Sequence, residues 1–267
     1  MDTPATSERK VLLEATGLAK SFGGIRALDG VDLRVHEGEV VTVIGPNGSG
    51  KSTLFNLLTG IYRIDAGSVT LAGRTITNLP AHKLAEAGLA RTFQNIRLFT
   101  NLTVLENVMI GLHTAVRARV WESVLGTPGL KAREKAAKER ALEILSIFSK
   151  RLYPRLDHPV FSLSYANRRR VEIARALAVN PRLLLLDEPT AGMNPFETAE
   201  LVENIEQIKA MGFAMVIIEH KLDVVNKVSD RVMVLDHGKK IAEGSAHEVR
   251  NNPYVIEAYL GHPAAAA

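Results

Sequence analysis

The sequence predicts an α/β fold with a mainly parallel sheet, an N-terminal antiparallel β subdomain and a helical insertion. Helices and apolar strands alternate from residue 163 onward, including RLLLLD at 182–187 and FAMVIIEH at 213–220. Strands of this kind suit a parallel sheet that is buried on both faces. Short strands interrupted by glycine and aspartate fill residues 11–44, whereas apolar residues recur at helical spacing between 102 and 150.

The N-terminal elements follow in order. The segments VLLEATGLAK, ALDGVDLRV and EVVTVI predict strands, and the loop GPNGSG at 45–50 leads into a helix, KSTLFNLLTG, that Gly60 ends. SVTLAG at 68–73 predicts another strand. Pro80 opens and Gly88 closes a predicted helix, after which ARTFQ returns to strand character.

The C-terminal elements complete the pattern. RRRVEIARALAV at 168–179 and PFETAELVENIEQIKAMG at 195–212 predict helices on either side of the strand RLLLLD. RVMVLD at 231–236 predicts a further buried strand, and HGKKIAEG at 237–244 predicts a hairpin turn with an edge strand. NNPYVIEAYLG predicts a closing helix.

Composition excludes several classes of protein. The 267 residues are 46% apolar and 23% charged, as in globular proteins, and the lack of cysteine excludes disulfide scaffolds and thiol catalysis. No apolar run approaches the ~18 residues of a membrane span, and the first ten residues lack the apolar stretch of a secretory signal. We therefore expect a soluble, cytoplasmic chain. A net charge of +4 with 5% aromatic residues does not favour a nucleic-acid partner.

A glycine-rich loop carries the strongest functional signal. Residues 45–52 fit the pattern G-x-x-x-x-G-K-[ST] between an apolar strand and a helix, which is the context of a phosphate-binding loop. Its backbone N–H groups and the helix N-terminus favour an anion. We expect Lys51 to reach the β- and γ-phosphates and Ser52 to offer its hydroxyl to Mg²⁺. The predicted nucleotide-binding residues are Gly45, Pro46, Asn47, Gly48, Ser49, Gly50, Lys51, Ser52 and Thr53.

Two carboxylates follow the apolar run Leu183–Leu186. Because ligands bind at the carboxyl ends of strands in open parallel sheets, Asp187 and Glu188 are candidate site residues. Asp187 is expected to hold Mg²⁺ through its water shell, and Glu188 to orient or deprotonate an attacking water. A solvated turn explains LDEPT equally well in isolation, but the phosphate loop favours the functional interpretation.

Further motifs stand in an order that resembles the ATP-binding subunits of ABC transporters. Gln94 matches the glutamine loop, LSYAN at 163–167 stands where the signature LSGGQ belongs, and His220 matches the switch histidine. AGMN at 191–194 matches the loop after the second acidic motif, and Phe22 takes the place of an aromatic ring that stacks on adenine. The resemblance covers about residues 11 to 261 and implies a P-loop NTPase core.

The resemblance also implies roles for these residues. Two such subunits pair head to tail with ATP between them, so that Ser164 and the amides of Tyr165 and Ala166 contact the γ-phosphate across the interface. Glu188 would be the catalytic base, His220 would contact and sense the γ-phosphate, and Gln94 would touch Mg²⁺ and the attacking water. Ala166 and Asn167 depart from the signature pattern and are expected to weaken it. The basic run Arg168 to Arg170 is interpreted as a solvated face.

The resemblance narrows to one subfamily through four features: RTFQNIRLFTNLTVLENV, the insertion around 113–140, AGMNP, and the ending RNNPYVIEAYLG. That subfamily energises importers of branched-chain amino acids and related polar solutes. It implies ATP and Mg²⁺ as cofactors. The implied partners are permease subunits, a second ATP-binding subunit in a homodimer or heterodimer, and indirectly a periplasmic solute-binding protein. The chain would then lie on the cytoplasmic face of the inner membrane.

Other functions remain open at this point. The chain is also compatible with the ATPase of a lipopolysaccharide-export transporter, although that relative lacks the longer insertion. A soluble ABC ATPase that acts on ribosomes or DNA and a non-catalytic binding module are further alternatives. In every case we expect one ATPase domain over 11–260, with a core and β subdomain at 11–94 and 168–260 and a helical subdomain at 95–167. Residues 1–10 and 262–267 are expected to be flexible.

Overall fold

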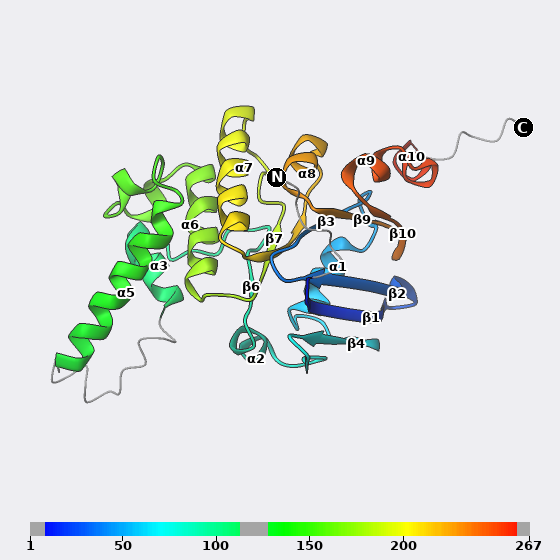
Figure 1. Cartoon of the computed structure of the whole chain (residues 1–267), viewed down its shortest axis with the longest axis horizontal. Helices are drawn as coiled ribbons and strands as arrows, with labels where there is room; N and C mark the ends of the chain where they lie inside the picture. The colour runs from blue at the N-terminus through cyan, green and yellow to red at the C-terminus, as the bar shows by residue number, and fades with distance from the viewer. Residues whose placement is uncertain (1–8, 113–127, 261–267) are drawn as a thin grey trace, which may run out of the picture. The chain divides into compact units, whose positions relative to one another are not determined.

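The computed structural model describes residues 9–112 and 128–260, which form two compact units (Figure 1). The first unit holds the described residues up to Arg91, Arg182–Pro189 and those from Ile208 onward. The second unit holds Thr92–Pro181 and Thr190–Gln207. The predicted flexible ends fall mostly outside the described residues, and so do residues 113–127 of the insertion predicted around 113–140.

The first unit contains two sheets within its described residues. The antiparallel sheet has the order β2-β1-β4-β5, and its strands are β1 (Val11–Phe22), β2 (Ile25–His36), β4 (Ala66–Leu71) and β5 (Arg74–Thr75). The second sheet has the order β10-β9-β3-β8-β7-β6, and only its edge strand β10 runs antiparallel. Its strands are β3 (Val40–Ile44), β6 (Leu89–Arg91), β7 (Leu183–Asp187), β8 (Ala214–Ile218), β9 (Arg231–Asp236) and β10 (Lys239–Gly244). The predicted fold class is therefore confirmed.

A hydrophobic core joins these two sheets through helix α1 (Lys51–Leu58). Leu54, Phe55 and Leu58 of this helix are buried in one cluster with residues of both sheets, such as Leu13 and Leu185. The other helices of the first unit are α2 (Ala81–Glu86), α8 (Leu222–Val228), α9 (Ala246–Arg250) and α10 (Pro253–Leu260). The cluster anchors α1 and so places the start of that helix directly after the glycine-rich loop.

The second unit is helical within its described residues. Its elements are α3 (Val104–Gly111), α5 (Pro128–Ser146), η2 (Tyr153–Arg155), η3 (Val160–Ser162), α6 (Tyr165–Ala178) and most of α7 (Pro195–Ala210). A capping box begins α3, because Thr103 and Glu106 each accept a hydrogen bond from the other's backbone N–H. Helix α3 lies so close to α6 that a Cβ on Gly111 would stand 2.5 Å from the carbonyl oxygen of Arg175. Only glycine fits there.

No helix within the described ranges 9–112 and 128–260 is both long and apolar enough to cross a bilayer.

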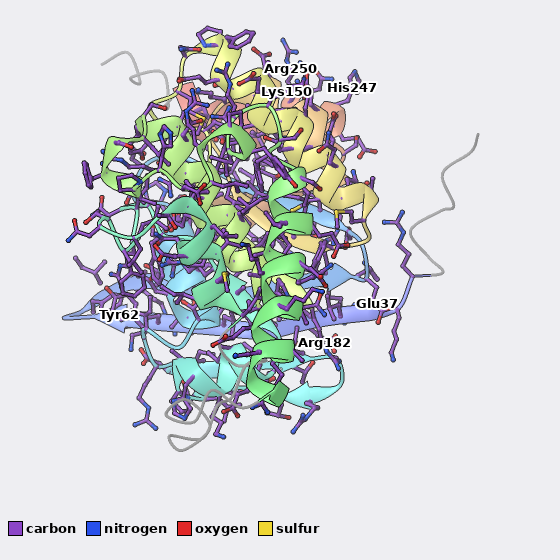
Figure 2. All side chains as sticks on the ribbon, turned by 90° about the vertical axis from the view of Figure 1, so that its left-hand side faces the viewer. Glu37, Tyr62, Lys150, Arg182, His247 and Arg250 are labelled. Carbon is purple, nitrogen blue, oxygen red and sulfur yellow. The ribbon has the colours of Figure 1, made fainter. Side chains whose placement is uncertain are left out.

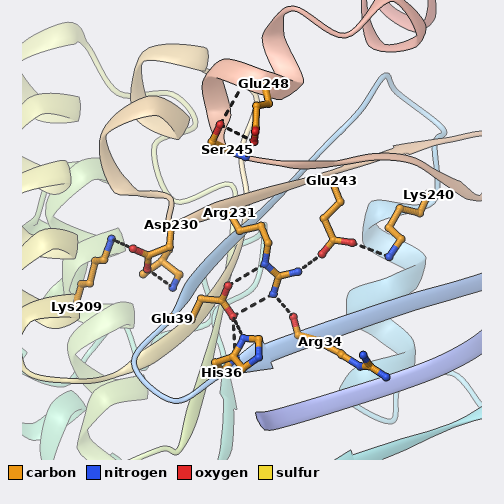
Figure 3. Close-up of polar contacts among 11 residues, drawn as sticks. Arg34, His36, Glu39, Lys209, Asp230, Arg231, Lys240, Glu243, Ser245 and Glu248 are labelled. Atoms are coloured by element: carbon orange, nitrogen blue, oxygen red, sulfur yellow. Dashed lines mark hydrogen bonds and ion pairs between the residues drawn. The ribbon is translucent and has the colours of Figure 1, made fainter. Parts of the chain in front are cut away.

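A network around Arg231 ties the two sheets of the first unit together (Figure 3). Glu39, which is fully buried, accepts hydrogen bonds from Arg231 Nε at 2.9 Å and from the backbone N–H of His36 at 2.8 Å. Arg231 also pairs with Glu243 on β10 and donates to the carbonyl oxygen of Arg34 on β2. Burial raises the pKa of Glu39, but the hydrogen bonds from Arg231 and His36 outweigh it and lower that pKa below its usual value.

Replacing the buried carboxylate should destabilise the first unit. We expect Glu39→Gln to reduce the free energy of unfolding by about 2 kcal/mol, below the ~3–5 of a fully buried pair because Arg231 stays partly exposed. Since the pKa is lowered in the folded state, this contribution is present above the unfolded pKa of ~4.3 and is lost as the pH falls through the folded value. Urea denaturation at pH 7 and at pH 4 measures it, and the difference from wild type should shrink at the lower pH.

Glu37→Gln is the matched control. Glu37 is exposed two residues away, is labelled in Figure 2, and makes no ion pair within the described chain, so its neutralisation should leave stability within about 0.5 kcal/mol of wild type. If Glu39→Gln and Glu37→Gln change the free energy of unfolding equally, the Arg231 network does not stabilise the contact between the two sheets.

Candidate active site

The register of three parallel strands brings the predicted motifs of the first unit to one edge of the sheet. Ile218 of β8 pairs with Val43 of β3 on one side and with Asp187 of β7 on the other. The glycine-rich loop begins two residues after Val43, Glu188 follows Asp187, and His220 lies two residues beyond Ile218. Because these strands are parallel, the three segments leave the sheet side by side.

Close backbone contacts shape the glycine-rich loop. Gly45 has a φ of 148°, and a Cβ there would stand 2.0 Å from the carbonyl oxygen of Leu235. Gly50 has a φ of 106° and caps helix α1, and its Cβ would meet the carbonyl oxygen of Ala27 at 2.7 Å. Neither position can hold a larger residue without displacing the backbone, so the sequence motif reflects the packing of the loop.

Lys51 lies buried under the loop. Its ammonium group donates hydrogen bonds to the carbonyl oxygens of Gly45 at 2.8 Å and Pro46 at 2.9 Å. Burial lowers the pKa of Lys51, and the nearby carboxylates of Glu188 and Asp187 oppose that shift. The structure therefore brings the predicted loop lysine into the field of both predicted carboxylates.

Asp187 forms a nearly buried ion pair with Arg91. Arg91 Nη2 lies 2.7 Å from Asp187 Oδ2, and the two side chains are 7% and 6% exposed. Arg91 Nη1 also donates to Asn56 Oδ1 on helix α1 at 2.7 Å and to Oγ1 of its C-cap residue Thr59 at 3.0 Å. Arg91 therefore connects the acidic strand end to the helix that follows the glycine-rich loop.

Glu188 faces His220 in an uncommon backbone conformation. Its φ of 46° lies in the left-handed region, which costs a residue with a side chain about 1–2 kcal/mol. Glu188 Oε1 lies 2.9 Å from His220 Nε2, and both side chains are partly exposed. An outlier of this kind, held by the surrounding strands, is typical of a functional position.

The chemistry of the donors at this edge fits Mg²⁺. Among the described residues no cluster of three or more His, Cys, Asp or Glu side chains could hold a metal alone. Mg²⁺ commonly binds one or two carboxylates and takes its remaining ligands from water and phosphate. Asp187, with the exposed hydroxyl of Ser52 at the start of α1, offers such an incomplete set of oxygen ligands.

Phe22, the predicted adenine-stacking residue, lies near the tip of the β1–β2 hairpin. Its ring is 41% exposed and meets the ring of Tyr62, labelled in Figure 2, edge to face at 5.0 Å between centroids. Lys20 Nζ lies 5.3 Å from the centroid of the same ring. Phe22 therefore does not belong to the core, and its exposed ring can stack on a base.

The predicted glutamine loop and signature belong to the second unit. Gln94 is exposed, and Ser164 caps the N-terminus of α6 by accepting from the backbone N–H of Asn167. Ala166 is buried in the first turn of that helix, where a methyl group meets no conformational penalty. The Asn167 side chain accepts a hydrogen bond from Arg170 at 3.2 Å.

The interpretation of Arg168 to Arg170 as a solvated face is wrong for two of the three residues. Arg169 and Arg170 are 0% and 1% exposed. Arg169 pairs with Glu172 at 2.7 Å, and Arg170 pairs with Glu200 at 3.1 Å. Both arginines can be buried because a carboxylate accompanies each of them.

Arg169 also holds the glutamine loop. It donates to the carbonyl oxygens of Phe93 and Gln94, the latter at 2.7 Å, and to the Tyr165 hydroxyl at 2.9 Å. Glu172 accepts from the backbone N–H of Phe93 at 3.3 Å. Within the second unit, the backbone of the glutamine loop is thereby attached to helix α6.

Sequence reasoning missed both Arg91 and Arg169. Arg91 ends a short strand and meets a carboxylate 96 positions later, and Arg169 reaches a carbonyl oxygen 76 positions earlier. Neither partner is visible from local spacing. The available signals are a lone arginine at the end of an apolar strand and, for Arg169, the i,i+3 spacing to Glu172.

Comparison with known proteins defines the class. The family model described as "ABC transporter" matches residues 28–191, and the model "Branched-chain amino acid ATP-binding cassette transporter" matches residues 239–265. The chain therefore belongs to the ABC transporter family, as its motifs predicted.

Individual relatives agree with this assignment. The chain is 40% identical over 251 residues to the high-affinity branched-chain amino acid transport ATP-binding protein BraF of Pseudomonas aeruginosa, covering 94% of this chain and 98% of BraF. It superimposes with a TM-score of 0.81 and 36% identity on the ADP conformation of MJ1267, an ATP-binding cassette of an ABC transporter, covering 94% of this chain and 99% of that one. A dimeric post-hydrolysis structure of the cassette MJ0796, bound to ADP and Pi, gives a TM-score of 0.74 and 27% identity, with 88% and 99% covered.

The Arg91–Asp187 pair should appear as an energetic coupling. We expect Arg91→Gln to lower the free energy of unfolding by about 3 kcal/mol, because it leaves Asp187 buried without its charged partner. The double variant Arg91→Gln/Asp187→Asn should lose less free energy of unfolding than the two single variants lose together. The difference, which is the coupling energy, should be about 1–3 kcal/mol. Urea denaturation followed by circular dichroism measures the four proteins of the cycle. Arg63→Gln, at an exposed position, is the control, and strictly additive effects would disprove the coupling.

Proposed function

We propose that this chain is the ATP-hydrolysing subunit of an ABC importer for branched-chain amino acids or a related small polar solute. The observation that carries the proposal is the strand edge where Lys51, Asp187, Glu188 and His220 meet. Lys51 is a buried cation beneath an anion-binding loop. Beside it lie Asp187, which is paired with Arg91, and the more accessible Glu188. Such an arrangement suits phosphoryl transfer to water.

Each residue has a distinct task in this proposal. The backbone of residues 45–53 and Lys51 bind the phosphates, which places the γ-phosphate at the start of α1. Ser52 and Asp187 hold Mg²⁺, which neutralises phosphate charge when bound. Glu188 accepts the proton of the attacking water, and its carboxylate is available because Arg91 pairs with Asp187 instead. His220, held 2.9 Å from Glu188, contacts the γ-phosphate.

A second ATP-binding subunit completes the site in this proposal. The N-terminus of α6, with Ser164 and the amides of Tyr165 and Ala166, contacts the γ-phosphate of the partner subunit's ATP. Gln94 touches Mg²⁺ and the water from the glutamine loop. The burial of Ala166 in a regular helical turn supports the view that the altered signature keeps the N-terminus of α6 intact. The dimeric structure of MJ0796 makes such a pairing a precedent within the family.

The import of branched-chain amino acids is supported by two likenesses. The C-terminal residues 239–265 match the branched-chain amino acid transporter model, and BraF is named for high-affinity transport of these solutes. We infer that the chain works with permease subunits on the cytoplasmic face of the inner membrane and indirectly with a periplasmic solute-binding protein. These likenesses favour an importer over a lipopolysaccharide exporter or a soluble ATPase.

ATP hydrolysis should depend on Glu188. We expect Glu188→Gln to lower kcat by about 100-fold or more while ATP binding is retained, because the amide cannot accept the proton. Phosphate release measures hydrolysis, and a fluorescent ATP analogue measures binding. Glu203→Gln, an exposed substitution of the same kind, should keep wild-type activity. If Glu188→Gln hydrolyses ATP as fast as wild type does, Glu188 is not the base.

Solute import should also require Glu188. In a bacterial strain that lacks its own branched-chain amino acid uptake, the chain expressed with its neighbouring permease, ATPase and binding-protein genes should restore accumulation of radiolabelled leucine. The Glu188→Gln version should not restore it, because ATP hydrolysis drives the uptake. ATP hydrolysis without leucine uptake by the complete set would reject the proposed solute while keeping the ATPase assignment.

A further inference from the structure

An open cavity of about 720 Å³ lies in the first unit, and no residue of the predicted nucleotide loop lines it. It is bordered by the end of β3, by β9 and by helices α8, α9 and α10. Eight of its lining side chains are aliphatic, among them Ile44, Val225, Val249 and Val255. This volume lies within the ~300–1,000 Å³ that small-molecule sites occupy, and the apolar lining is typical of them.

The cavity lining has a few polar side chains, and none of them in the described ranges is acidic. Arg250 on α9, labelled in Figure 2, and Asn226 on α8 line it together with His220. Within the described chain, neither Arg250 nor Asn226 has a side-chain hydrogen bond or ion pair. No acidic residue is among the described residues that line the cavity. The lining therefore complements an apolar ligand with one negative charge.

We propose that this cavity binds a small aliphatic carboxylate. Arg250 pairs with the carboxylate, Asn226 donates a hydrogen bond to it, and the valine and isoleucine side chains enclose the hydrocarbon part. The free amino acid is a poorer fit, because its ammonium group would lie beside a guanidinium with no carboxylate in the lining to balance it. The ligand class is thus distinct from the solute proposed for import.

The cavity adjoins the proposed nucleotide site, because His220 lines both of them. None of residues 45–53, Asp187 or Glu188 lines it. Ile44 directly precedes the loop, and Tyr259 on α10 lies over Gly45. Burial raises the pKa of the Tyr259 hydroxyl, and a hydrogen bond from the Gly45 N–H partly offsets that rise. A ligand enclosed here contacts the residues that carry the phosphate loop.

Binding to the purified full-length chain without nucleotide tests the proposal, independently of any ATPase activity. The probes are 4-methylpentanoate, its uncharged amide and leucine, titrated by calorimetry. We expect the carboxylate to bind at least about tenfold more tightly than either of the others, a difference of about 1.4 kcal/mol. Equal binding of the acid and the amide, or tighter binding of leucine, would overturn the assignment of ligand class.

Two variants and a control locate the site. Arg250→Gln should weaken binding of 4-methylpentanoate about tenfold, and Ile256→Trp, at a partly exposed lining position, should remove binding by filling the cavity. Arg74→Gln, an exposed arginine outside the cavity, should bind as wild type does. Circular dichroism verifies that each variant is folded. Wild-type affinity in both cavity variants, or no binding by the wild-type chain, disproves the site.

Discussion

The pairing of β8 between β3 and β7 is the constraint on which the candidate active site depends. Val43, Ile218 and Asp187 stand in one row across the three strands, so the loop, the two carboxylates and the histidine leave the sheet together. A slip of one residue on β7 would turn Asp187 to the opposite face and move Glu188 away from His220. The apolar run of β7, buried at every position, helps to exclude such a slip because it packs on both faces.

That register gathers charged groups at one edge of the sheet, and the structure gives the two carboxylates different partners. Asp187 is almost fully enclosed and is held by Arg91, which α1 supports through Asn56 and Thr59. Glu188 is more exposed and faces a histidine. Neighbouring residues of one strand end thus obtain different properties from their surroundings, as the two different roles proposed for Asp187 and Glu188 require.

Much of this arrangement could be predicted from sequence because it is local. The glycine-rich loop between strand and helix, the apolar runs of β7 and β8 and the carboxylates after Leu186 each depend on neighbours in the chain. The distant contacts of Arg91, Arg169, Arg170 and Glu39 could not be assigned in this way, because each of these residues has a partner more than 25 positions away in sequence. An arginine run on a helix is usually solvated, and Arg169 and Arg170 depart from that rule only because Glu172 and Glu200 meet them in the fold.

The buried arginine of the second unit has a mechanical consequence. Arg169 lies in the second turn of α6, whose first turn carries part of the predicted signature and whose N-cap is Ser164. Its guanidinium fork and the Glu172 carboxylate together hold the backbone of Phe93 and Gln94. A planar, charged group that satisfies several acceptors at once resists bending more than single neutral hydrogen bonds do. We therefore expect the backbone of Gln94 and the first turns of α6, which Ser164 caps, to move together within the second unit.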